Sequence, residues 1–375
     1  MISFRVQSRS GQARAGLLVT EHGDVPTPAF MPVGTQAVVK GLDAEDLERL
    51  GVRMAIMNTY HLWLRPGAET VAAHGGLQGF SRFRGAVFTD SGGFQAFSLA
   101  ERVVLREDGV EFSSHLDGRR LLLSPEEAMR VQGLLGSDVA MQLDVCPPGG
   151  APRAEVEAAV ARTTRWAERC LAAAKPAQAV FGIVQGGVDV ELRLAHLEAL
   201  AKLPFAGLAL GGFSVGEPNE LMHRTLVEVA PKLDAERPRY LMGVGTPSDL
   251  VRGIRAGIDI FDCVIPTRNA RNGQAFTRTG RISIRNARYR EDRAPLEAEC
   301  RCPTCSGGYS RAYLRHLHIA HEMTAARLLT LHNVAFYVEL VTAARRAIER
   351  GAYDEWAKAR LSELESRDSD EAFGG

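Results

Sequence analysis

Eight short apolar runs recur along the sequence, and almost every one ends in a glycine or in a residue with a carboxylate or amide side chain. The runs are "AFMPVG" to Gly34, "MAIMN" to Asn58, "AVFTD" to Asp90, "VAMQLD" to Asp144, "VFGIVQ" to Gln185, "GLALGG" to Gly212, "YLMGVG" to Gly245 and "DIFDCV", which passes Asp262. Continuous rather than alternating apolar runs are typical of strands that are buried on both faces. The pattern therefore predicts a parallel sheet with helices on its surface.

Helical patterns lie between several of these runs. Residues 152–174, 189–203 and 219–233 are amphipathic, and "TPSDLVRGIRAG" offers Thr246 as N-cap with Pro247 at the first helical position. Eight strands that alternate with helices predict an α/β fold of the (β/α)8 or TIM barrel type, whose active sites lie at the carboxyl ends of the strands. A doubly wound open sheet is the alternative, but no GxGxxG opens a helix after the first strand.

Two segments stand outside the repeating unit. Residues 103–124, "VVLREDGVEFSSHLDGRRLLLS", carry alternating runs around two Asp-Gly pairs and predict hairpin strands. An insertion at this place would form a lid or a partner surface over the strand ends. The first 25 or so residues precede the first barrel strand and predict a small cap.

The bulk composition excludes few functions. Among 375 residues, 45 basic and 45 acidic side chains balance, so nucleic-acid binding would need a local basic patch. No window approaches the roughly eighteen apolar residues that a membrane span needs, and the first residues lack an apolar signal core. We therefore expect a cytoplasmic protein without a membrane partner.

Three of the predicted strand ends carry aspartate, namely Asp90, Asp144 and Asp262. Each alone could simply cap the helix that follows. Three at one barrel mouth, beside the glycine-rich stretches "SGGFQ" and "VQGG", favour a functional site, since glycine lets a flat ligand approach the backbone. Paired carboxylates suit reactions at a glycosidic carbon, where one attacks and the other protonates the leaving group. Ser91 does not lie in the GxSxG pattern of hydrolases.

An arginine-rich segment follows Asp262. Between 268 and 293 there are eight arginines against Glu291 and Asp292, a balance of 8 − 2 = +6. A solvated charged face is the simpler interpretation. Lysine is absent, however, and the planar guanidinium binds phosphate oxygens in pairs, so an RNA or DNA backbone is a suitable partner.

Three cysteines then fall within six residues, at 300, 302 and 305. Thiols at this spacing can reach one tetrahedral zinc ion, and unligated surface thiols so close together would oxidise. The fourth ligand would come from His316, His318, His321 or His332. With three thiolates in place the predicted ion is structural, because no open position remains for catalysis.

Taken together, "TDSGGFQ", "MQLDVC", "FGIVQGG", "LALGGFSVGE", "FDCVIPTRNARNGQAFT" and "CRCPTC…RAYLRHL…LHN" resemble the bacterial tRNA-guanine transglycosylases, also called queuine tRNA-ribosyltransferases. The resemblance covers residues 5–345 approximately. It implies a (β/α)8 barrel with a zinc-binding subdomain inserted late. It also implies a pentosyltransferase of queuosine biosynthesis, which exchanges the wobble guanine of GUN-anticodon tRNAs for a 7-deazaguanine.

The resemblance also implies roles for individual residues. Asp262 corresponds to the nucleophile that forms a covalent ribosyl intermediate, Asp90 to the general acid/base and His332 to the fourth zinc ligand. The base-binding residues by the same resemblance are Asp90, Ser91, Gly92, Gly93, Phe94, Asp144, Cys146, Gln185, Gly211, Gly212, Phe213 and Val215. Val215 and Cys146 favour 7-aminomethyl-7-deazaguanine over the larger queuine. Phe94 stands where tyrosine is usual and Phe213 where leucine is usual.

The resemblance predicts two kinds of partner. The tRNA anticodon loop would contact Arg268, Arg271, Arg311 and Arg315, because sequence-specific RNA recognition favours single-stranded loops, and a second copy of the chain would form a homodimer. We expect a barrel with its cap over 1–290, a zinc-binding subdomain over 291–345, and a C-terminal helix with a polar tail over 346–375. The alternatives are an RNA-binding subunit without activity, which the presence of Asp90 and Asp262 disfavours, and an archaeosine-type enzyme, for whose extra C-terminal domains the chain ends too soon.

Overall fold

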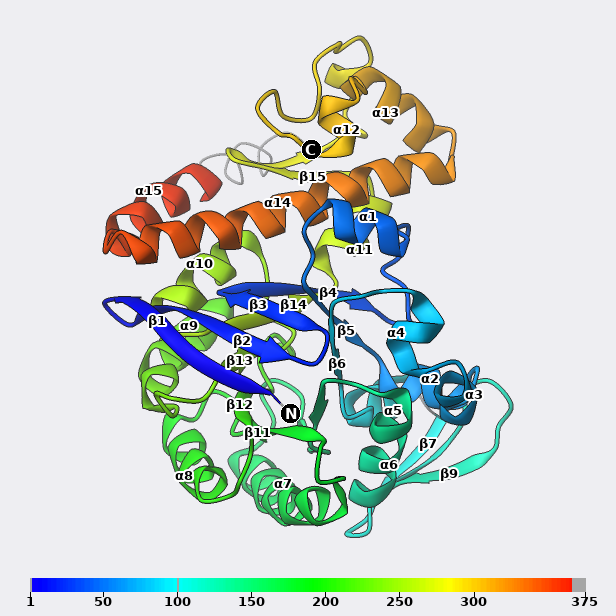
Figure 1. Cartoon of the computed structure of the whole chain (residues 1–375), viewed down its shortest axis with the longest axis vertical. Coiled ribbons are helices and arrows are strands. Elements are labelled where there is room, and N and C mark those ends of the chain that lie inside the picture. The colour runs from blue at the N-terminus through cyan, green and yellow to red at the C-terminus, as the bar shows by residue number, and fades with distance from the viewer. Residues whose placement is uncertain (1, 100, 366–375) are drawn as a thin grey trace.

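A closed barrel of eight parallel strands forms the centre of the computed structural model, which describes residues 2–99 and 101–365 (Figure 1). Around the barrel the strands follow the order β10-β11-β12-β13-β14-β4-β5-β6. Their bounds are β4 Ala29–Gly34, β5 Met54–Met57, β6 Ala86–Thr89, β10 Val139–Met141, β11 Ala179–Val184, β12 Gly207–Leu210, β13 Arg239–Leu241 and β14 Ile260–Cys263. Each predicted apolar run overlaps one of these strands, so the predicted fold class is confirmed.

Helices connect the strands and cover the outside of the barrel. They are α1 Ala44–Arg49, α2 Thr59–Leu64, α3 Ala68–Ala73, α4 Gly76–Ser81, α5 Gly93–Leu99, α6 Pro125–Leu135, α7 Arg153–Ala173, α8 Val190–Ala201, α9 Asn219–Val229 with the 3-10 turn η1 Ala230–Lys232, α10 Pro247–Arg255 and α11 Ile265–Arg271. Helix α10 begins as predicted: the Thr246 side chain accepts a hydrogen bond from the Asp249 N–H, and Pro247 is its first residue.

The N-terminal residues form an antiparallel sheet of β1 Ser3–Ser10, β2 Ala13–Thr20 and β3 Gly23–Thr27. Arg14, fully buried, donates to both carboxylate oxygens of Asp259, at 2.9 and 2.5 Å. Asp259 immediately precedes β14, so this sheet is joined to the amino end of the barrel, away from the ends that carry the predicted site.

The insertion between β6 and β10 is the predicted set of hairpin strands. Strands β7 Glu101–Leu105, β8 Val110–Ser113 and β9 Arg120–Leu123 form an antiparallel sheet. Its first turn is joined to α7, because Arg165 Nε lies 2.6 Å from a Glu107 carboxylate oxygen and the Trp166 ring N–H donates to the Glu107 carbonyl at 2.8 Å. Arg165 also holds the pKa of Glu107 down at about 2. The sheet is therefore attached at its turn as well as at its ends.

The C-terminal part comprises β15 Gln274–Thr277, β16 Gly280–Ser283, the 3-10 turn η2 Ala287–Tyr289, α12 Pro303–Ser306, α13 Arg311–Ile319, α14 Met323–Glu349 and α15 Tyr353–Glu365. The long helix α14 lies between the barrel and the cysteine-containing segment (Figure 1), and packs on α11, β4 and the N-terminal sheet. The ring centroids of Phe30 and Tyr337 lie 4.6 Å apart in this contact. The predicted polar tail, 366–375, lies outside the described residues. Among the helices that are described, none has the length and apolarity of a membrane span.

Candidate active site and metal centre

Asp90 follows β6 directly, and its carboxylate is fixed by the start of α2. The Thr59 N–H donates to Oδ1 at 2.9 Å, and the Asn58 side-chain amide donates to Oδ2 at 2.5 Å. Asn58 itself caps α2. The Thr59 N–H is one of the first free donors of α2, so Asp90 does bind the start of a helix. This helix precedes Asp90 in the sequence, however, and is not the following helix that the capping interpretation predicts.

Asp262 lies within β14 and is 8% exposed. Its Oδ1 accepts hydrogen bonds from the Tyr240 hydroxyl at 2.6 Å and the Gly243 N–H at 2.7 Å. Among the described residues, none donates a hydrogen bond to Oδ2. Burial raises the pKa of Asp262, and the two donors oppose that rise. The carboxylate thus has one oxygen held in place and one oxygen available.

Asp90 and Asp262 share one electrostatic environment. Burial raises the pKa of Asp90 to about 7, and the charge of Asp262 contributes in the same direction. The pKa of Tyr240 is also raised, first by burial, then by Asp262 and Asp90. A titratable pair with perturbed pKa values at a barrel mouth is the pattern expected of an acid and a nucleophile that act together.

Asp144, the third predicted carboxylate, pairs with two other predicted residues. Gln185 donates to its Oδ2 at 2.6 Å and Ser91 to its Oδ1 at 3.3 Å. Burial raises the pKa of Asp144 to about 6. Within the described part of the chain, the buried Gln185 Oε1 finds no hydrogen-bond partner. Because a buried polar atom without a partner is costly, this acceptor is suited to a ligand N–H.

The glycines provide a wall without side chains. Gly212 has φ +66°, and a Cβ there would lie 2.2 Å from Gln185 Oε1, so a larger residue could not share the space. Phe94, at the start of α5, is 51% exposed and offers a ring face for stacking. Cys146 is half-buried, and burial together with Asp144 raises the pKa of its thiol to about 12. The remaining predicted wall residues, Gly92, Gly93 and Gly211, are buried.

The loop after β12 contains a functional candidate that the sequence did not single out. The Glu217 carboxylate accepts hydrogen bonds from the Ser214 N–H and, at 2.9 Å, from the Val215 N–H. In a trans peptide the carbonyl points opposite to the N–H, so the Phe213 carbonyl points away from Glu217. Tyr240 was missed as well, since a tyrosine within an apolar run predicts only a buried strand residue.

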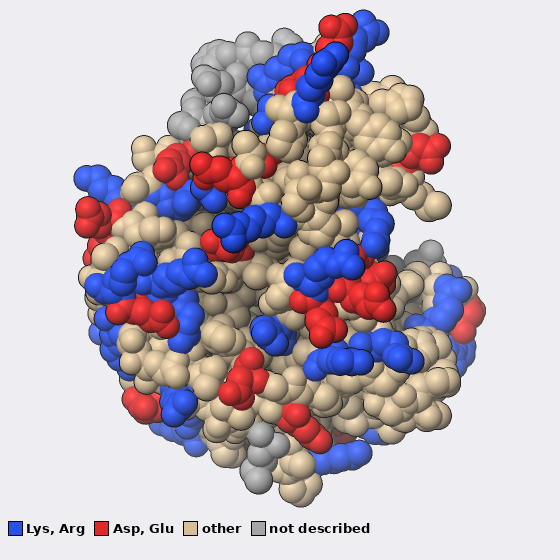
Figure 2. Space-filling model, turned by 45° about the horizontal axis from the view of Figure 1, so that its top comes forward, with Lys and Arg blue, Asp and Glu red and all other residues tan. Residues whose placement is uncertain are grey.

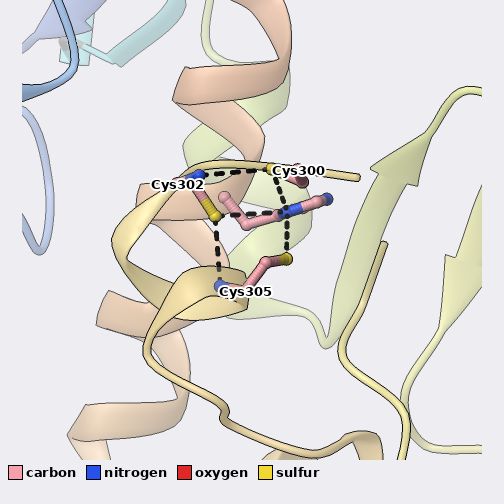
Figure 3. A group of neighbouring side chains, drawn as sticks. Cys300, Cys302 and Cys305 are labelled. Carbon is pink, nitrogen blue, oxygen red and sulfur yellow. Dashed lines mark hydrogen bonds between the residues drawn. The ribbon is translucent and has the colours of Figure 1, made fainter. Parts of the chain in front are cut away.

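Cys300, Cys302 and Cys305 lie around one point (Figure 3). His332 completes the group, and the four ligand atoms all lie within 4.8 Å of one another. His332 Nδ1 lies 3.7, 3.6 and 3.4 Å from the three sulfurs. A tetrahedral zinc site with ordinary bond lengths predicts S···N separations of about 3.6 Å. His332 Nε2 lies 2.7 Å from the Phe276 carbonyl, which requires Nε2 to carry the proton and leaves Nδ1 free to bind metal. The group fits a metal ion, and of the four histidines left open only His332 belongs to it.

Comparison with known proteins agrees with this arrangement. The family model of queuine tRNA-ribosyltransferase matches residues 8–366. The chain belongs to the queuine tRNA-ribosyltransferase family. A queuine tRNA-ribosyltransferase of Sorangium cellulosum is 63% identical over 96% of this chain and 91% of its own length. Those of Syntrophobacter fumaroxidans and Neisseria meningitidis are 51% and 47% identical, over 98% and 99% of this chain and 99% and 100% of theirs. The predicted enzyme class, pentosyltransferase, is therefore confirmed.

In this member of the queuine tRNA-ribosyltransferase family, the four predicted RNA-binding arginines differ in their surroundings. Arg268 and Arg271, on α11, are exposed. Arg311 instead donates to Asp292 at 3.1 Å and to the Leu296 carbonyl at 2.9 Å, and Arg315 donates to the Asn286 carbonyl at 3.1 Å. Basic and acidic side chains are interspersed over the face seen in Figure 2. Within the described part of the chain, no hydrogen bond or ion pair engages the guanidinium groups of Arg268 and Arg271, and α11 follows the strand that carries Asp262.

Proposed function

We propose that the chain exchanges the wobble guanine of GUN-anticodon tRNAs for 7-aminomethyl-7-deazaguanine through a covalent ribosyl–Asp262 intermediate. The observation that carries this proposal is a pair of carboxylates at the barrel mouth, Asp262 buried and Asp90 partly buried, in which the charge of Asp262 helps to raise the pKa of Asp90. Their hydrogen-bond partners differ, which gives the two groups different tasks.

Asp262 is suited to attack the ribose C1′ atom. Tyr240 and Gly243 bind Oδ1, and this fixes the carboxylate while Oδ2 can face the sugar. A buried carboxylate is poorly hydrated, so it is a better nucleophile than one in water. As the Oδ2–C1′ bond forms, the C1′–N9 bond breaks and its electron pair leaves with guanine.

Asp90 is suited to move the proton. With a pKa of about 7, it is present in both protonation states at neutral pH. It protonates the departing guanine, and afterwards takes the N9 proton from the incoming deazaguanine. That base then attacks C1′ and releases Asp262. Two displacements at one carbon retain the configuration of the sugar.

The remaining pocket residues support a flat base with an aminomethyl group. Asp144, Ser91 and Gln185 present hydrogen-bonding groups, and Phe94 presents an exposed ring face. The Phe213 carbonyl, turned away from Glu217, would accept a hydrogen bond from the ammonium group. Val215 borders a cavity of about 200 Å³ together with Gly149 and Gly187, and its side chain limits the substituent that can enter.

Base choice has a direct test. The purified protein is expected to incorporate 7-aminomethyl-7-deazaguanine into tRNA and to exclude queuine. Val215→Gly removes the limiting side chain and should admit queuine, while Val215→Ala serves as the matched intermediate. Efficient queuine incorporation by the unaltered protein would contradict this part of the proposal, without affecting the exchange reaction itself.

For the partners, we propose that Arg268 and Arg271 bind anticodon-loop phosphates. We also propose that one structural zinc ion is held by Cys300, Cys302, Cys305 and His332, here named the Cys300–His332 group. A homodimer is supported by exposed apolar side chains at the two ends of α13. The ring centroids of Tyr309 and Tyr313 lie 5.9 Å apart, the two side chains are 37% and 44% exposed, and Met323 is 88% exposed.

The cytoplasm, where tRNA is found, remains the predicted compartment. The division of the chain into a barrel up to residue 290, a zinc-binding subdomain up to residue 345 and a C-terminal part also remains a proposal. Helix α14 runs through the second of these boundaries.

The exchange reaction itself is tested with radiolabelled guanine and unmodified tRNA. The unaltered protein should incorporate label and form an adduct with tRNA that survives denaturing electrophoresis. Asp262→Asn keeps the shape of the side chain, so it should bind tRNA with unchanged affinity but form no adduct. Binding without exchange by the unaltered protein would instead support the alternative of an RNA-binding subunit without activity.

A further inference from the structure

Arg193, in α8, is a buried cation at the back of the base pocket. Its side chain is 0% exposed, and its hydrogen bonds go to backbone carbonyls: Gly187 at 2.6 Å, Gly211 at 2.9 Å, Val184 at 3.2 Å and Gly212 at 3.4 Å. None of these acceptors is a carboxylate, whereas the equally buried Arg14 is neutralised by Asp259. A buried charge without an ionic partner is costly, so its retention calls for a physical reason.

The hydrogen bonds of Arg193 fix the orientation of two peptide units. Because the Gly211 and Gly212 carbonyls point toward the guanidinium, the N–H groups of the same peptides, those of Gly212 and Phe213, point away from it. Neither N–H takes part in a backbone hydrogen bond among the described residues. Gln185 packs against these glycines, since a Cβ at Gly211 would lie 2.9 Å from its Nε2. Two free donors are thus held beside Gln185.

The side chain of Phe213 strengthens this arrangement. It is 3% exposed, and its ring centroid lies 3.6 Å from the Arg193 guanidinium carbon. A ring face attracts a cation more strongly when both are removed from water, and an aliphatic side chain would lack this attraction. The backbone of Phe213 can therefore face the pocket while its side chain holds the loop from behind.

We propose that Arg193 is a positioning residue of the transglycosylation, which orients the Gly212 and Phe213 N–H groups and directs its positive charge through these peptides onto the carbonyl edge of the base. The inference rests on the proposed function. When C1′–N9 breaks, the electron pair on guanine spreads from N9 over the ring to O6. Fixed donors backed by a cation stabilise that charge with little reorganisation. Burial lowers the pKa of Arg193 only to about 9, so the group stays charged at neutral pH.

The test compares two bases that differ at the 6-carbonyl and, with it, at the N1 proton. Guanine carries the 6-carbonyl, whereas 2-aminopurine lacks it. Their affinities are measured by calorimetry, which needs no turnover, for the unaltered protein, Arg193→Met, Arg193→Lys and Phe213→Leu. Arg193→Met should weaken guanine binding by about tenfold or more and leave 2-aminopurine binding within about twofold, because only the carbonyl uses the oriented donors. Arg193→Lys, which keeps the charge, should recover part of the loss, and Phe213→Leu should show the smallest change.

If Arg193 had a purely structural role, Arg193→Met would weaken the binding of both bases in parallel. This result, or no change in the affinity for either base, would overturn the proposal. Should Arg193→Met fail to fold, the ratio of the two affinities in Arg193→Lys and Phe213→Leu decides the question in the same way. Failure of the proposed function would be separate: the unaltered protein would then show no guanine exchange, whatever the selectivity of the variants.

Discussion

The barrel mouth and the Cys300–His332 group both bring several ionisable side chains together, but they do so in opposite ways. At the mouth, hydrogen bonds fix each group and still leave Asp262 Oδ2 and Gln185 Oε1 without donors from the described residues. In the cysteine group, the three sulfurs face His332 Nδ1, and His332 Nε2 is already bound to a carbonyl. A site that keeps free atoms can receive a substrate, whereas a closed set of ligands can only hold an ion and the chain around it.

The two regions are connected through α14. Next to His332, the Asn333 side chain donates to the carbonyls of Pro266 and Gln274, at 2.9 and 3.0 Å, and accepts from the Phe276 N–H at 3.0 Å. Pro266 belongs to α11, which carries Arg268 and Arg271. The comparison therefore predicts a division of effects. Changes at the mouth should alter chemistry, and changes in the cysteine group should alter tRNA binding.

Asp90→Asn should show the largest effect. The variant keeps the size of the side chain but cannot transfer a proton, so guanine exchange should fall on the order of 10³-fold, within the range known for general acid–base catalysis. Initial rates with labelled guanine measure this loss, and a gel-shift titration should give unchanged tRNA affinity. Loss of tRNA affinity in parallel with rate would show that the two regions are not separable.

A pH profile provides the control for Asp90. Burial raises its pKa to about 7, so the protonated form that helps guanine leave is present below that pH and is lost above it. The single-turnover rate of adduct formation should accordingly decline above pH 7, by about tenfold per unit. In Asp90→Asn the decline should be absent. A decline that persists in the variant would assign it to another group.

Loss of the proposed metal ion should have the next largest effect. Cys302→Ser, or treatment with a strong chelator, removes the attachment between α12 and α14, and should weaken tRNA binding on the order of 30-fold. Guanine affinity, measured by calorimetry, should change less than about twofold. Ser306→Ala, one turn away on α12, is the matched control. An equal loss of guanine binding would indicate that the ion supports the whole barrel rather than the RNA surface.

These regions also differ in how far the sequence could predict them. The apolar runs predicted the strands, and the barrel then placed Asp90, Asp144 and Asp262 at one mouth, because parallel strands end on the same side. The cysteine spacing predicted a metal site without any fold. The sequence alone left four histidines as candidates for the fourth ligand. Only the path of α14 brings one of them, His332, to the three cysteines.

Other site residues gave no usable signal in the sequence. Tyr240 looks like an ordinary strand residue, and its role depends on the neighbouring β14, which brings Asp262 to its hydroxyl. Arg193 lies in an amphipathic helix, where arginine predicts an exposed face. It is buried because α8 packs against β11, whose end presents carbonyls to the guanidinium. Both contacts depend on tertiary packing, which local patterns do not encode.

Tyr240→Phe should have an intermediate effect on the rate of the reaction at the barrel mouth. It removes one of the two hydrogen bonds to Asp262 Oδ1 and leaves the one from Gly243. A hydrogen bond to a charged group is worth enough that the rate of adduct formation should fall about tenfold. Because that hydrogen bond lowers the pKa of Asp262, its loss should also move the acidic limb of the pH–rate profile to higher pH. An unchanged profile would show that Tyr240 only fills space.

The smallest expected effect separates the arginines of the proposed RNA surface. Arg271 is exposed on α11, so Arg271→Ala should weaken tRNA binding about fivefold and reduce the dependence of log affinity on log salt by about one. Arg311 is bound to Asp292 and the Leu296 carbonyl and lies near the Tyr289 ring, so Arg311→Ala should instead lower thermal stability. Its salt dependence should match that of the unaltered protein, because no phosphate contact is lost. If Arg311→Ala changes the salt slope and Arg271→Ala does not, the RNA lies over α13 rather than α11, and the attachment of α14 to α11 would then serve the barrel alone.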